Sequence, residues 1–346
     1  MKRVFENQKH GVSRRSFLRG SAAAGAGALV APAFITRSAW AKSKVLKVGH
    51  IEAPSSATHQ SYLTFQKLVA ERSGGSVEVK VFPAGQLGGL RDLFEGIRFG
   101  SIEMTSSGPD YVSNLVPMVV CASLYYLWRS ESHARKVLAG ADGSIFDKFL
   151  IDKAQLRVMA WGNLGFRSVF NTKRAIETPA DLAGLKIRVP EAKLHLLPMK
   201  ALGALPTPIP YAEVYTSMQT NIVDAAEAVP AVMLQQKFNE VSKFYSLTNH
   251  LFNPLMVVIG ERFYQSLDAK EKEAVVESAR EAWREEWDVA AKDNNTAIDR
   301  IKAGGVPVNT VDMAPFAKIC EPTWKELVDP LGDEGWRIVK KFKDAA

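Results

Sequence analysis

Two arginines in apolar settings are the residues of this sequence best suited to hold a charged molecule. Arg167 lies in the stretch GFRSVFN, and Arg188 lies in GLKIRVP, further along the chain. A guanidinium presents a planar fork of N–H donors that matches a carboxylate, and it stays protonated at neutral pH. Two such groups predict a site for an anion. The alternative is structural, because an arginine at a strand end often forms an internal ion pair or lays its stem along the surface.

The position of Arg188 within its strand favours the binding interpretation. In the run LKIRV the apolar residues point to one face and Arg188 points to the other, before Pro190 ends the strand. The apolar residues are Leu185, Ile187 and Val189. Ligands of open α/β sheets collect at the carboxyl ends of strands. We therefore expect a rigid strand end to deliver Arg188, away from the face that packs in the core.

The elements that position these arginines follow a basic N-terminal segment. The net charge of the chain is +7, and residues 1–41 contain seven basic residues against one acidic residue, so the remainder is nearly neutral and we expect no nucleic-acid partner. The segment contains SRRSFLR, a run of small and apolar residues, and the A-x-A pattern Ala39-Trp40-Ala41. This order predicts a twin-arginine signal peptide cleaved after Ala41, and hence a protein of the periplasm.

Strands and helices alternate after the signal segment. The expected strands include VLKVGHI (45–51), VEVKVF (77–82), IEMTSSG (102–108) and LRVMAW (156–161). Helical patterns separate several of these strands, as between residues 58 and 72. This alternation is typical of an α/β protein with a largely parallel sheet.

One helical pattern is unusually long. It runs from residue 268 to 303, carries Trp283 and Trp287 one turn apart, and is followed by Gly304. A helix longer than about 25 residues in a globular chain suggests an element shared between two domains, or a kinked pair of helices. A chain of 346 residues is also long enough for two domains.

Several other functions are disfavoured by what the sequence lacks. Cys121 and Cys320 make no disulfide framework, and we expect two separate buried thiols. The six histidines are scattered without metal-ligand spacing, so we expect no metal site. No G-x-S-x-G and no cofactor motif is visible, so we expect neither an enzyme nor a cofactor. No stretch after the signal segment is long and apolar enough for a membrane span.

Blocks of the sequence, taken in order, resemble the substrate-binding proteins of TRAP transporters, of the DctP type. The most specific run spans residues 165–227, with a G-x-R block at Arg167 and a K-[IL]-R-V-P block at Arg188. Residues 81–109, residues 236–250 and the long helix also match, so the resemblance covers essentially the whole chain after the signal segment. Such proteins are exported, catch an organic acid and hand it to a membrane permease driven by an ion gradient.

The resemblance implies an α/β fold of the type II periplasmic binding-protein class. In this class two lobes surround a hinge, and a long C-terminal helix is shared between them. We expect a signal peptide at 1–41, lobe I at 42–163 plus 255–293, and lobe II at 164–254 plus 294–346.

The resemblance also implies which residues bind the ligand. Arg188 takes the place of the principal arginine, which forms a salt bridge to the ligand carboxylate, and Arg167 takes the place of the second arginine, which supports it. Tyr211 lies where an aromatic ring packs on the ligand, although a core position is the alternative. The full set of expected ligand-binding residues is Arg188, Arg167, Tyr211, Ala228, Ser107 and Tyr111.

Departures from the family pattern bear on the ligand. Sugar-acid members place an asparagine after the glutamate of the V-D-G-x-E block, whereas Glu227 is followed here by Ala228. The positions that contact hydroxyl groups in those members correspond to Ile51, Gly89 and Gly108. Unpaired buried polar groups are costly, so we expect a small or aromatic carboxylate with few hydroxyl groups.

The expected function is therefore that of a TRAP solute-binding protein with no resident cofactor or metal. Its partners would be a carboxylate ligand and the membrane subunits of the permease, and we expect a monomer. Two alternatives stay open at this point: a binding protein that senses a ligand for a membrane receptor, which would use the same fold, and an exported enzyme.

Overall fold

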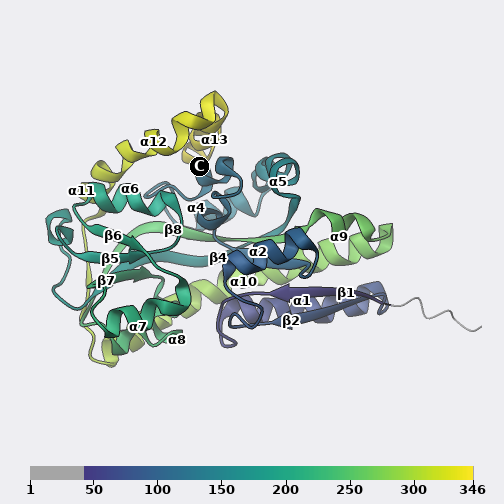
Figure 1. Cartoon of the computed structure of the whole chain (residues 1–346), viewed down its shortest axis with the longest axis horizontal. Coiled ribbons are helices and arrows are strands. Elements are labelled where there is room, and N and C mark those ends of the chain that lie inside the picture. The colour runs from purple at the N-terminus through teal and green to yellow at the C-terminus, as the bar shows by residue number, and fades with distance from the viewer. Residues whose placement is uncertain (1–42, 346) are drawn as a thin grey trace, which may run out of the picture. The chain divides into compact units, whose positions relative to one another are not determined.

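The computed structural model describes residues 43–345. The expected signal peptide and its cleavage position after Ala41 lie outside the described residues. Figure 1 shows the strands and helices of the described part. The strands are β1 (Lys44–Gly49), β2 (Val77–Phe82), β3 (Met104–Ser107), β4 (Leu156–Asn171), β5 (Lys186–Val189), β6 (Leu205–Pro208), β7 (Ala225–Ala228), β8 (Phe244–Gly260) and β9 (Val308–Thr310).

The α-helices alternate with these strands through the first two thirds of the chain and then dominate it. They are α1 (Ala57–Ser73), α2 (Leu90–Phe99), α3 (Pro109–Val112), α4 (Glu131–Leu138), α5 (Asp147–Ala154), α6 (Lys193–Ala201), α7 (Val214–Gln219), α8 (Pro230–Gln235), α9 (Glu261–Ser266), α10 (Ala269–Ala303), α11 (Met313–Cys320), α12 (Trp324–Val328) and α13 (Gly332–Asp344). The short 3₁₀ helices that matter below are Pro117–Ala122, Pro179–Leu182 and Tyr211–Glu213.

A single mixed sheet organises the fold. Its order is β2-β1-β3-β8-β4-β7-β5-β6, and β9 pairs with β8. β1 is parallel to β2 and β3 at one end of the sheet, and β5 is parallel to β6 and β7 at the other end. Between them, β4 and β8 are antiparallel to each other and to their outer neighbours β7 and β3. The largely parallel sheet expected from the sequence is therefore wrong for the middle of the sheet.

The reason for this difference is the length of β4 and β8. LRVMAW and GFRSVFN, which look like separate segments in the sequence, form one strand of 16 residues, and β8 contains 17. Both strands continue from one end of the sheet to the other, as Figure 1 shows. Their register shifts between Val158 and Ala160, between Asn163 and Gly165, and between Arg167 and Val169. Such bulges bend a strand and increase its twist.

Gly165 makes the central bulge possible. Its φ of +109° is strained for any residue with a side chain. A Cβ at this position would also lie 2.4 Å from Asn294 Nδ2 on α10. The close approach of α10 to β4 therefore depends on a glycine at this point.

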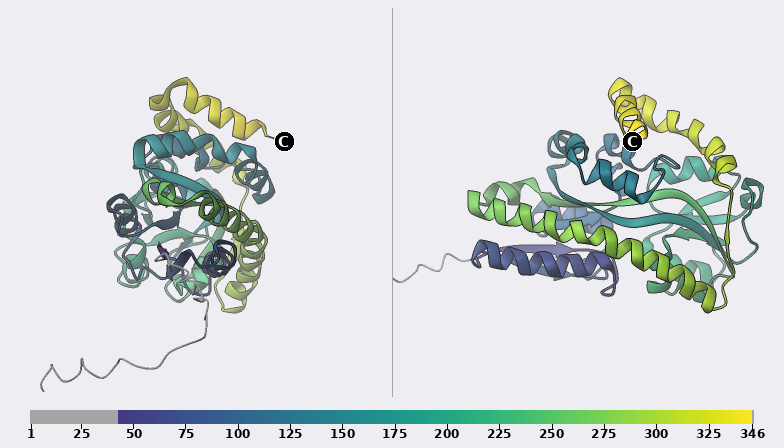
Figure 2. Two further views of the ribbon diagram at one scale, coloured as in Figure 1. Left: turned by 90° about the vertical axis from the view of Figure 1, so that its right-hand side faces the viewer. Right: turned by 180° about the vertical axis from the view of Figure 1, so that it is seen from behind.

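Helix α10 packs along both ends of the sheet, as the long helix in Figure 2 shows. It contacts α1 near one end of its length and α8 near the other. Asp268 begins it with a capping box, since its side chain accepts from the backbone N–H of Glu271 at 2.8 Å. The long helix expected at residues 268–303 is confirmed, and it forms one element from Ala269 to Ala303.

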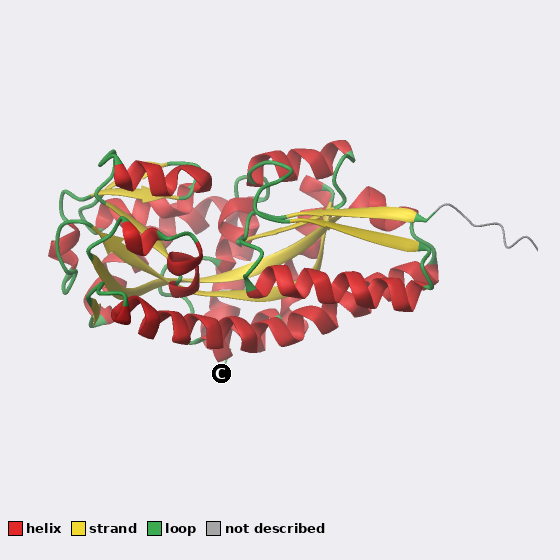
Figure 3. Ribbon diagram, turned by 90° about the horizontal axis from the view of Figure 1, so that it is seen from below, coloured by secondary structure: helices red, strands yellow, loops and turns green. Residues whose placement is uncertain are grey.

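The apolar core has a separate cluster at each end of the sheet. At the β1 end, Val48 of β1, Phe65 of α1 and Trp283 of α10 are buried together under the helices seen in Figure 3. At the β5 end, Phe170 of β4 and Met218 of α7 belong to another cluster that also reaches α10. A third cluster lies under the C-terminal helices and includes both cysteines. Burying these side chains supplies the main favourable free energy of folding.

The C-terminal helices α11–α13 close over segments from distant parts of the chain. Trp324 Nε1 donates to the backbone oxygen of Tyr125 at 3.0 Å. His133 Nε2 lies 2.9 Å from the backbone oxygen of Phe342, whose side chain is fully buried. Helix α11 also packs on α6. The end of the chain is therefore part of the core.

Cys121 and Cys320 are buried free thiols, as expected from their separation in the sequence. Burial raises the pKa of each thiol to about 12, so both stay protonated at neutral pH.

Glu286 of α10 predicts a pH dependence of stability. Its Oε2 accepts from the backbone N–H of Asn163 at 2.7 Å, at the central bulge of β4, and its Oε1 has no hydrogen-bond partner within residues 43–345. Burial raises the pKa of Glu286 to about 8, with the charges of Glu52 and Glu131 adding to the shift. The folded chain thus binds this proton more tightly than the unfolded chain, whose glutamate keeps its ordinary pKa of 4.5.

We expect the free energy of unfolding to fall as the pH rises from about 4.5 to about 8, by an amount on the order of a few kcal/mol from this group. Glu286→Gln keeps an acceptor for Asn163 and removes the titration, so the fall should become shallower. Urea unfolding at a series of pH values measures this slope. An equal slope in the two proteins would contradict the assignment.

Candidate ligand-binding site

A cavity of about 640 Å³ lies where β3, β4, β5 and β7 meet the loop before α2. All six residues expected to bind a ligand line this cavity. They lie up to 121 positions apart in the sequence. They are Ser107, Tyr111, Arg167, Arg188, Tyr211 and Ala228. The structure thus brings the expected residues together, and the volume of the cavity suits a small organic molecule.

The strand ends carry the polar groups of this cavity. Arg188 is at the carboxyl end of β5, as the alternation of LKIRV predicts, with Ile187 and Val189 fully buried on the opposite face. Ser107 ends β3, and Ala228 ends β7. These are the positions where ligands collect in open α/β sheets.

Gly108, directly after β3, keeps one wall of the cavity open. A Cβ at this residue would lie 2.0 Å from Asp110 Oδ1 and 2.8 Å from Asn253 Oδ1. Both distances are too short for a real contact, so glycine is required while these side chains keep their positions. The absence of a side chain at Gly108 therefore leaves the space that the side chains of Asp110 and Asn253 occupy.

Arg188 is a buried cation that forms no ion pair with any of the described residues. Its residue is 4% exposed, and its Nε donates to the backbone oxygen of Ile209 at 2.9 Å. Among the described residues its two terminal nitrogens form no hydrogen bond and no ion pair. Burial lowers the pKa of Arg188 to about 10, against the opposing effect of the Glu227 charge. This guanidinium therefore lacks a negative partner at the distance where one would stabilise it most.

Arg167, in contrast, has an internal partner. Its Nε donates to Glu227 Oε2, its Nη2 donates to Glu227 Oε1 at 2.5 Å, and the same nitrogen donates to the backbone oxygen of Glu227 at 3.0 Å. Burial alone would raise the pKa of Glu227, but the Arg167 charge and a contact with His250 outweigh it and hold that pKa far below its ordinary value. Nη1 of Arg167 forms no hydrogen bond within the described part of the chain.

The two aromatic residues of the predicted set form part of the cavity wall. Tyr211 is half-buried and meets the Phe238 ring edge-on, with ring centroids 6.5 Å apart. Burial raises its pKa, so the hydroxyl stays protonated. Tyr111, at the end of α3, stacks on Phe94 with centroids 6.1 Å apart. Both rings can pack on a ligand, and their hydroxyl groups form no hydrogen bond within residues 43–345.

Three further buried polar residues of the cavity were not predicted from the sequence. Asp110 Oδ2 lies 2.9 Å from His195 Nε2. Glu52 Oε2 lies 3.2 Å from His50 Nδ1. Asn253 Oδ1 is buried without a hydrogen-bond partner in the described residues. The sequence features that could have identified these residues are weak. Asp110 follows a proline, Glu52 follows a strand, and Asn253 interrupts an apolar run in β8.

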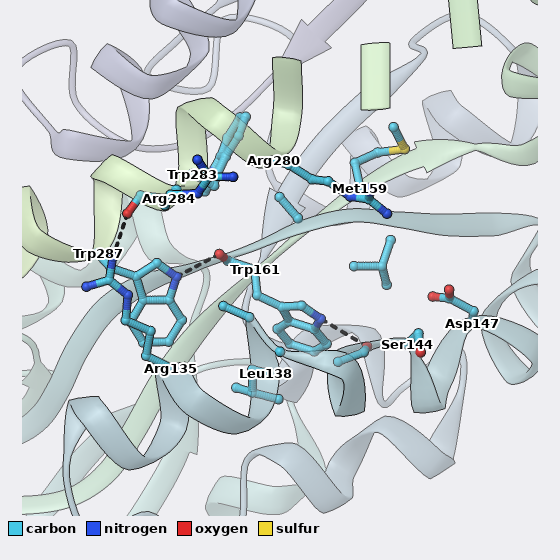
Figure 4. A pocket seen from close by; sticks show the side chains of 15 residues that line it. Arg135, Leu138, Ser144, Asp147, Met159, Trp161, Arg280, Trp283, Arg284 and Trp287 are labelled. Carbon is cyan, nitrogen blue, oxygen red and sulfur yellow. Dashed lines mark hydrogen bonds between the residues drawn. The ribbon is translucent and has the colours of Figure 1, made fainter. Parts of the chain in front are cut away.

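A second cavity, of about 280 Å³, is shown in Figure 4. Two of its three tryptophans have acceptors, since Trp287 Nε1 donates to the backbone oxygen of Trp161 at 2.8 Å and Trp161 Nε1 donates to that of Gly143 at 3.1 Å. The third, Trp283, has a buried Nε1 without a partner among the described residues. Arg135, on its rim, is paired with Asp288. The smaller cavity therefore contains no unpaired buried cation, and we place the ligand site in the larger one.

The fold and this cavity define a class of protein. Two groups of parallel strands are joined by the continuous strands β4 and β8, a long helix packs along both, and a buried guanidinium faces a cavity at the strand ends. This arrangement is the type II fold of periplasmic ligand-binding proteins.

Sequence comparison identifies the family within this class. A profile of the DctP family, bacterial extracellular solute-binding protein family 7, matches residues 48–330, and the chain belongs to this family. It is 37% identical over 278 residues to the 2,3-diketo-L-gulonate-binding periplasmic protein YiaO of Escherichia coli, a match that covers 80% of this chain and 84% of that protein.

Solved structures agree with this identification. A TRAP periplasmic solute-binding protein from Bradyrhizobium, in complex with galacturonate, superposes with a TM-score of 0.83 at 29% identity and covers 87% of this chain and 100% of that one. A TRAP solute-binding protein from Roseobacter denitrificans, with bound glucuronate, gives a TM-score of 0.84 at 28% identity, with 88% and 100% covered. The protein is thus a TRAP-type solute-binding protein.

The N-terminal segment also matches a known signal. A profile of the twin-arginine translocation signal matches residues 11–31, so the protein is exported to the periplasm. Cleavage after Ala41 stays a prediction. None of the helices in residues 43–345 is long and apolar enough to cross a membrane.

The contrast between the two arginines predicts opposite effects on stability. Arg167→Met leaves the Glu227 carboxylate buried without its partner, which should lower the free energy of unfolding by about 3–5 kcal/mol. Arg188→Met removes a buried cation that forms no ion pair within residues 43–345, so the ligand-free protein should be as stable as the wild type or more stable.

Urea unfolding of the ligand-free protein measures both changes. Equal destabilisation by the two substitutions would show that Arg188, too, depends on an internal negative partner.

Proposed function

We propose that this protein captures an organic acid by its carboxylate and delivers it to the membrane subunits of a TRAP permease. The observation that carries the proposal is Arg188, a guanidinium buried at the wall of a cavity with no ionic partner among the described residues. A ligand carboxylate would supply that partner. The family to which the chain belongs consists of solute-binding proteins, which favours binding over catalysis.

The two arginines have different parts in the proposal. Arg188 forms the salt bridge to the carboxylate, because its terminal nitrogens are free to donate. Arg167, held by Glu227, keeps its Nη1 free for a second donation to the same group or to a neighbouring oxygen. Such a pair of charges is desolvated together, so truncating Arg188 should cost on the order of 2–5 kcal/mol of binding free energy.

Two lobes closing on the ligand would complete the site. We propose that they are residues 42–163 plus 255–293 and residues 164–254 plus 294–346, with the bulges of β4 and β8 as the flexible connection. The support is that β4 and β8 cross between the two groups of parallel strands and shift register three times. We also propose that the protein acts as a monomer and is not an enzyme.

The ligand is proposed to be a small or aromatic carboxylate. YiaO is named for diketogulonate, and the two similar structures contain uronates, which are sugar acids with several hydroxyl groups. The cavity here has Ile51, Gly89, Gly108 and Ala228 among its lining residues, none of which carries a polar side chain. A ligand with fewer hydroxyl groups leaves fewer of them unsatisfied on burial.

A thermal-shift screen of the protein from Lys42 onward against a library of carboxylic acids tests the function. A ligand at 100 times its Kd stabilises the folded state by about 2.7 kcal/mol, which is visible as a raised Tm. The hit should disappear in Arg188→Met, which keeps the length of the side chain and removes its charge.

The matched control is Arg262→Met, on α9 and away from the residues that line the cavity, which should leave the shift unchanged. If no acid raises the Tm of the wild type, or if the shift survives in Arg188→Met, the proposed function is wrong.

A further inference from the structure

The charges around the cavity are unevenly compensated. Five acidic residues line it: Glu52, Asp92, Asp110, Glu191 and Glu227. Three basic residues do so: Arg91, Arg167 and Arg188. Arg167 is paired with Glu227, and the side chain of Arg91 is 81% exposed beside Glu95. Arg188 is therefore the one buried cation of the described lining that still lacks a negative partner, and one carboxylate neutralises it.

Glu52 places a negative charge at the wall of the same cavity, in contrast to the positive charge of Arg188. It is 9% exposed and follows β1, and its Oε1 accepts no hydrogen bond from the described residues. Its charge acts on Tyr211, as does that of Arg188, so the tyrosine lies within the influence of both groups. A second ligand carboxylate near Glu52 would meet a like charge, with only the exposed Arg91 to offset it.

The position of Glu52 is fixed by a chain of contacts behind it. Its Oε2 lies 3.2 Å from His50 Nδ1, and His50 Nε2 lies 3.0 Å from His59 Nδ1. Its backbone oxygen accepts from the N–H of Ala84 at 3.0 Å, in the loop that lines the cavity. A carboxylate held in this way is a preorganised acceptor.

Asn253 supplies an independent sign that this cavity receives a polar ligand group. It is 4% exposed, lines the cavity, and has a side-chain oxygen without a partner in the described residues. A buried amide left in this state is costly unless a ligand or water bonds to it. Glu52 and Asn253 therefore both have spare capacity to accept a hydrogen bond.

We infer that the cavity selects monocarboxylates that carry a hydroxyl or another hydrogen-bond donor away from the carboxylate, that it excludes dicarboxylates, and that Glu52 determines this choice. The inference rests on the proposed function, since it takes one carboxylate to be bound at Arg188. Dicarboxylates are rejected because the second carboxylate is repelled by the Glu52 carboxylate. Monocarboxylates with a donor group are accepted because that donor forms a hydrogen bond to the same carboxylate, so one residue produces both effects.

Pairs of acids that share a carbon skeleton test the selection. They are 4-hydroxybutanoate with succinate, erythronate with meso-tartrate, and 4-(hydroxymethyl)benzoate with terephthalate. In each pair one hydroxyl-bearing end is replaced by a second carboxylate. Isothermal titration of the protein from Lys42 onward should give a Kd at least about tenfold higher for the dicarboxylate of any pair whose monocarboxylate binds.

Glu52→Gln tests the residue, because it keeps an acceptor and removes the charge. The ratio of the two Kd values should fall by about tenfold, mainly through tighter binding of the dicarboxylate. Glu213→Gln removes the same charge from an exposed position two residues from Tyr211 and should leave the ratio unchanged. The Tm of each ligand-free variant shows whether it is folded.

The outcomes separate this inference from the proposed function. Dicarboxylates that bind as tightly as their partners would overturn the selection and leave carboxylate capture intact. A ratio that is unchanged in Glu52→Gln, or that changes equally in Glu213→Gln, would overturn the role of Glu52. Where the library screen identifies a different acid, the pair is built on the skeleton of that acid, and a screen without any hit overturns the proposed function together with this inference.

Discussion

The buried pair of Arg167 and Glu227 is the interaction on which the site depends. It joins neighbouring strands β4 and β7, and both partners have their charge satisfied before any ligand arrives. The pair therefore fixes one wall of the cavity and leaves Arg188 as the buried charge without an ion pair among the described residues of that cavity. Burying a charge without an ion pair is costly, and among the described residues that line the cavity this cost falls on Arg188. The proposed specificity for an anion rests on that imbalance.

The sequence predicts the surroundings of this pair well wherever the signal is local. The alternation of LKIRV correctly places Arg188 opposite Ile187 and Val189, and the capping pattern before residue 268 correctly begins α10. Motifs shared with the family led to six residues that the fold does bring to one cavity. Each of these signals lies within a single element or a single block of sequence.

What the sequence does not reveal depends on contacts between distant elements. Glu227 could not be recognised as the partner of Arg167, because the two residues meet only when β7 pairs with β4. Glu52 and Asn253 are single polar residues, and each has a side-chain oxygen that accepts no hydrogen bond from the described residues. A sequence motif does not reveal such a missing bond. The continuity of β4 was also hidden, since its glycines resemble a turn in the sequence and instead allow bulges within one long strand.

The C-terminal helices have a consequence for how the chain matures. Phe342 packs against Trp128 and Phe146, more than halfway back along the sequence, and is fully buried. This part of the core therefore stays open until α13 has been synthesised and has folded back onto segments far upstream in the sequence. A contact across such a sequence separation forms late in folding, because the entropy cost of closing the long intervening loop comes before the contact is made.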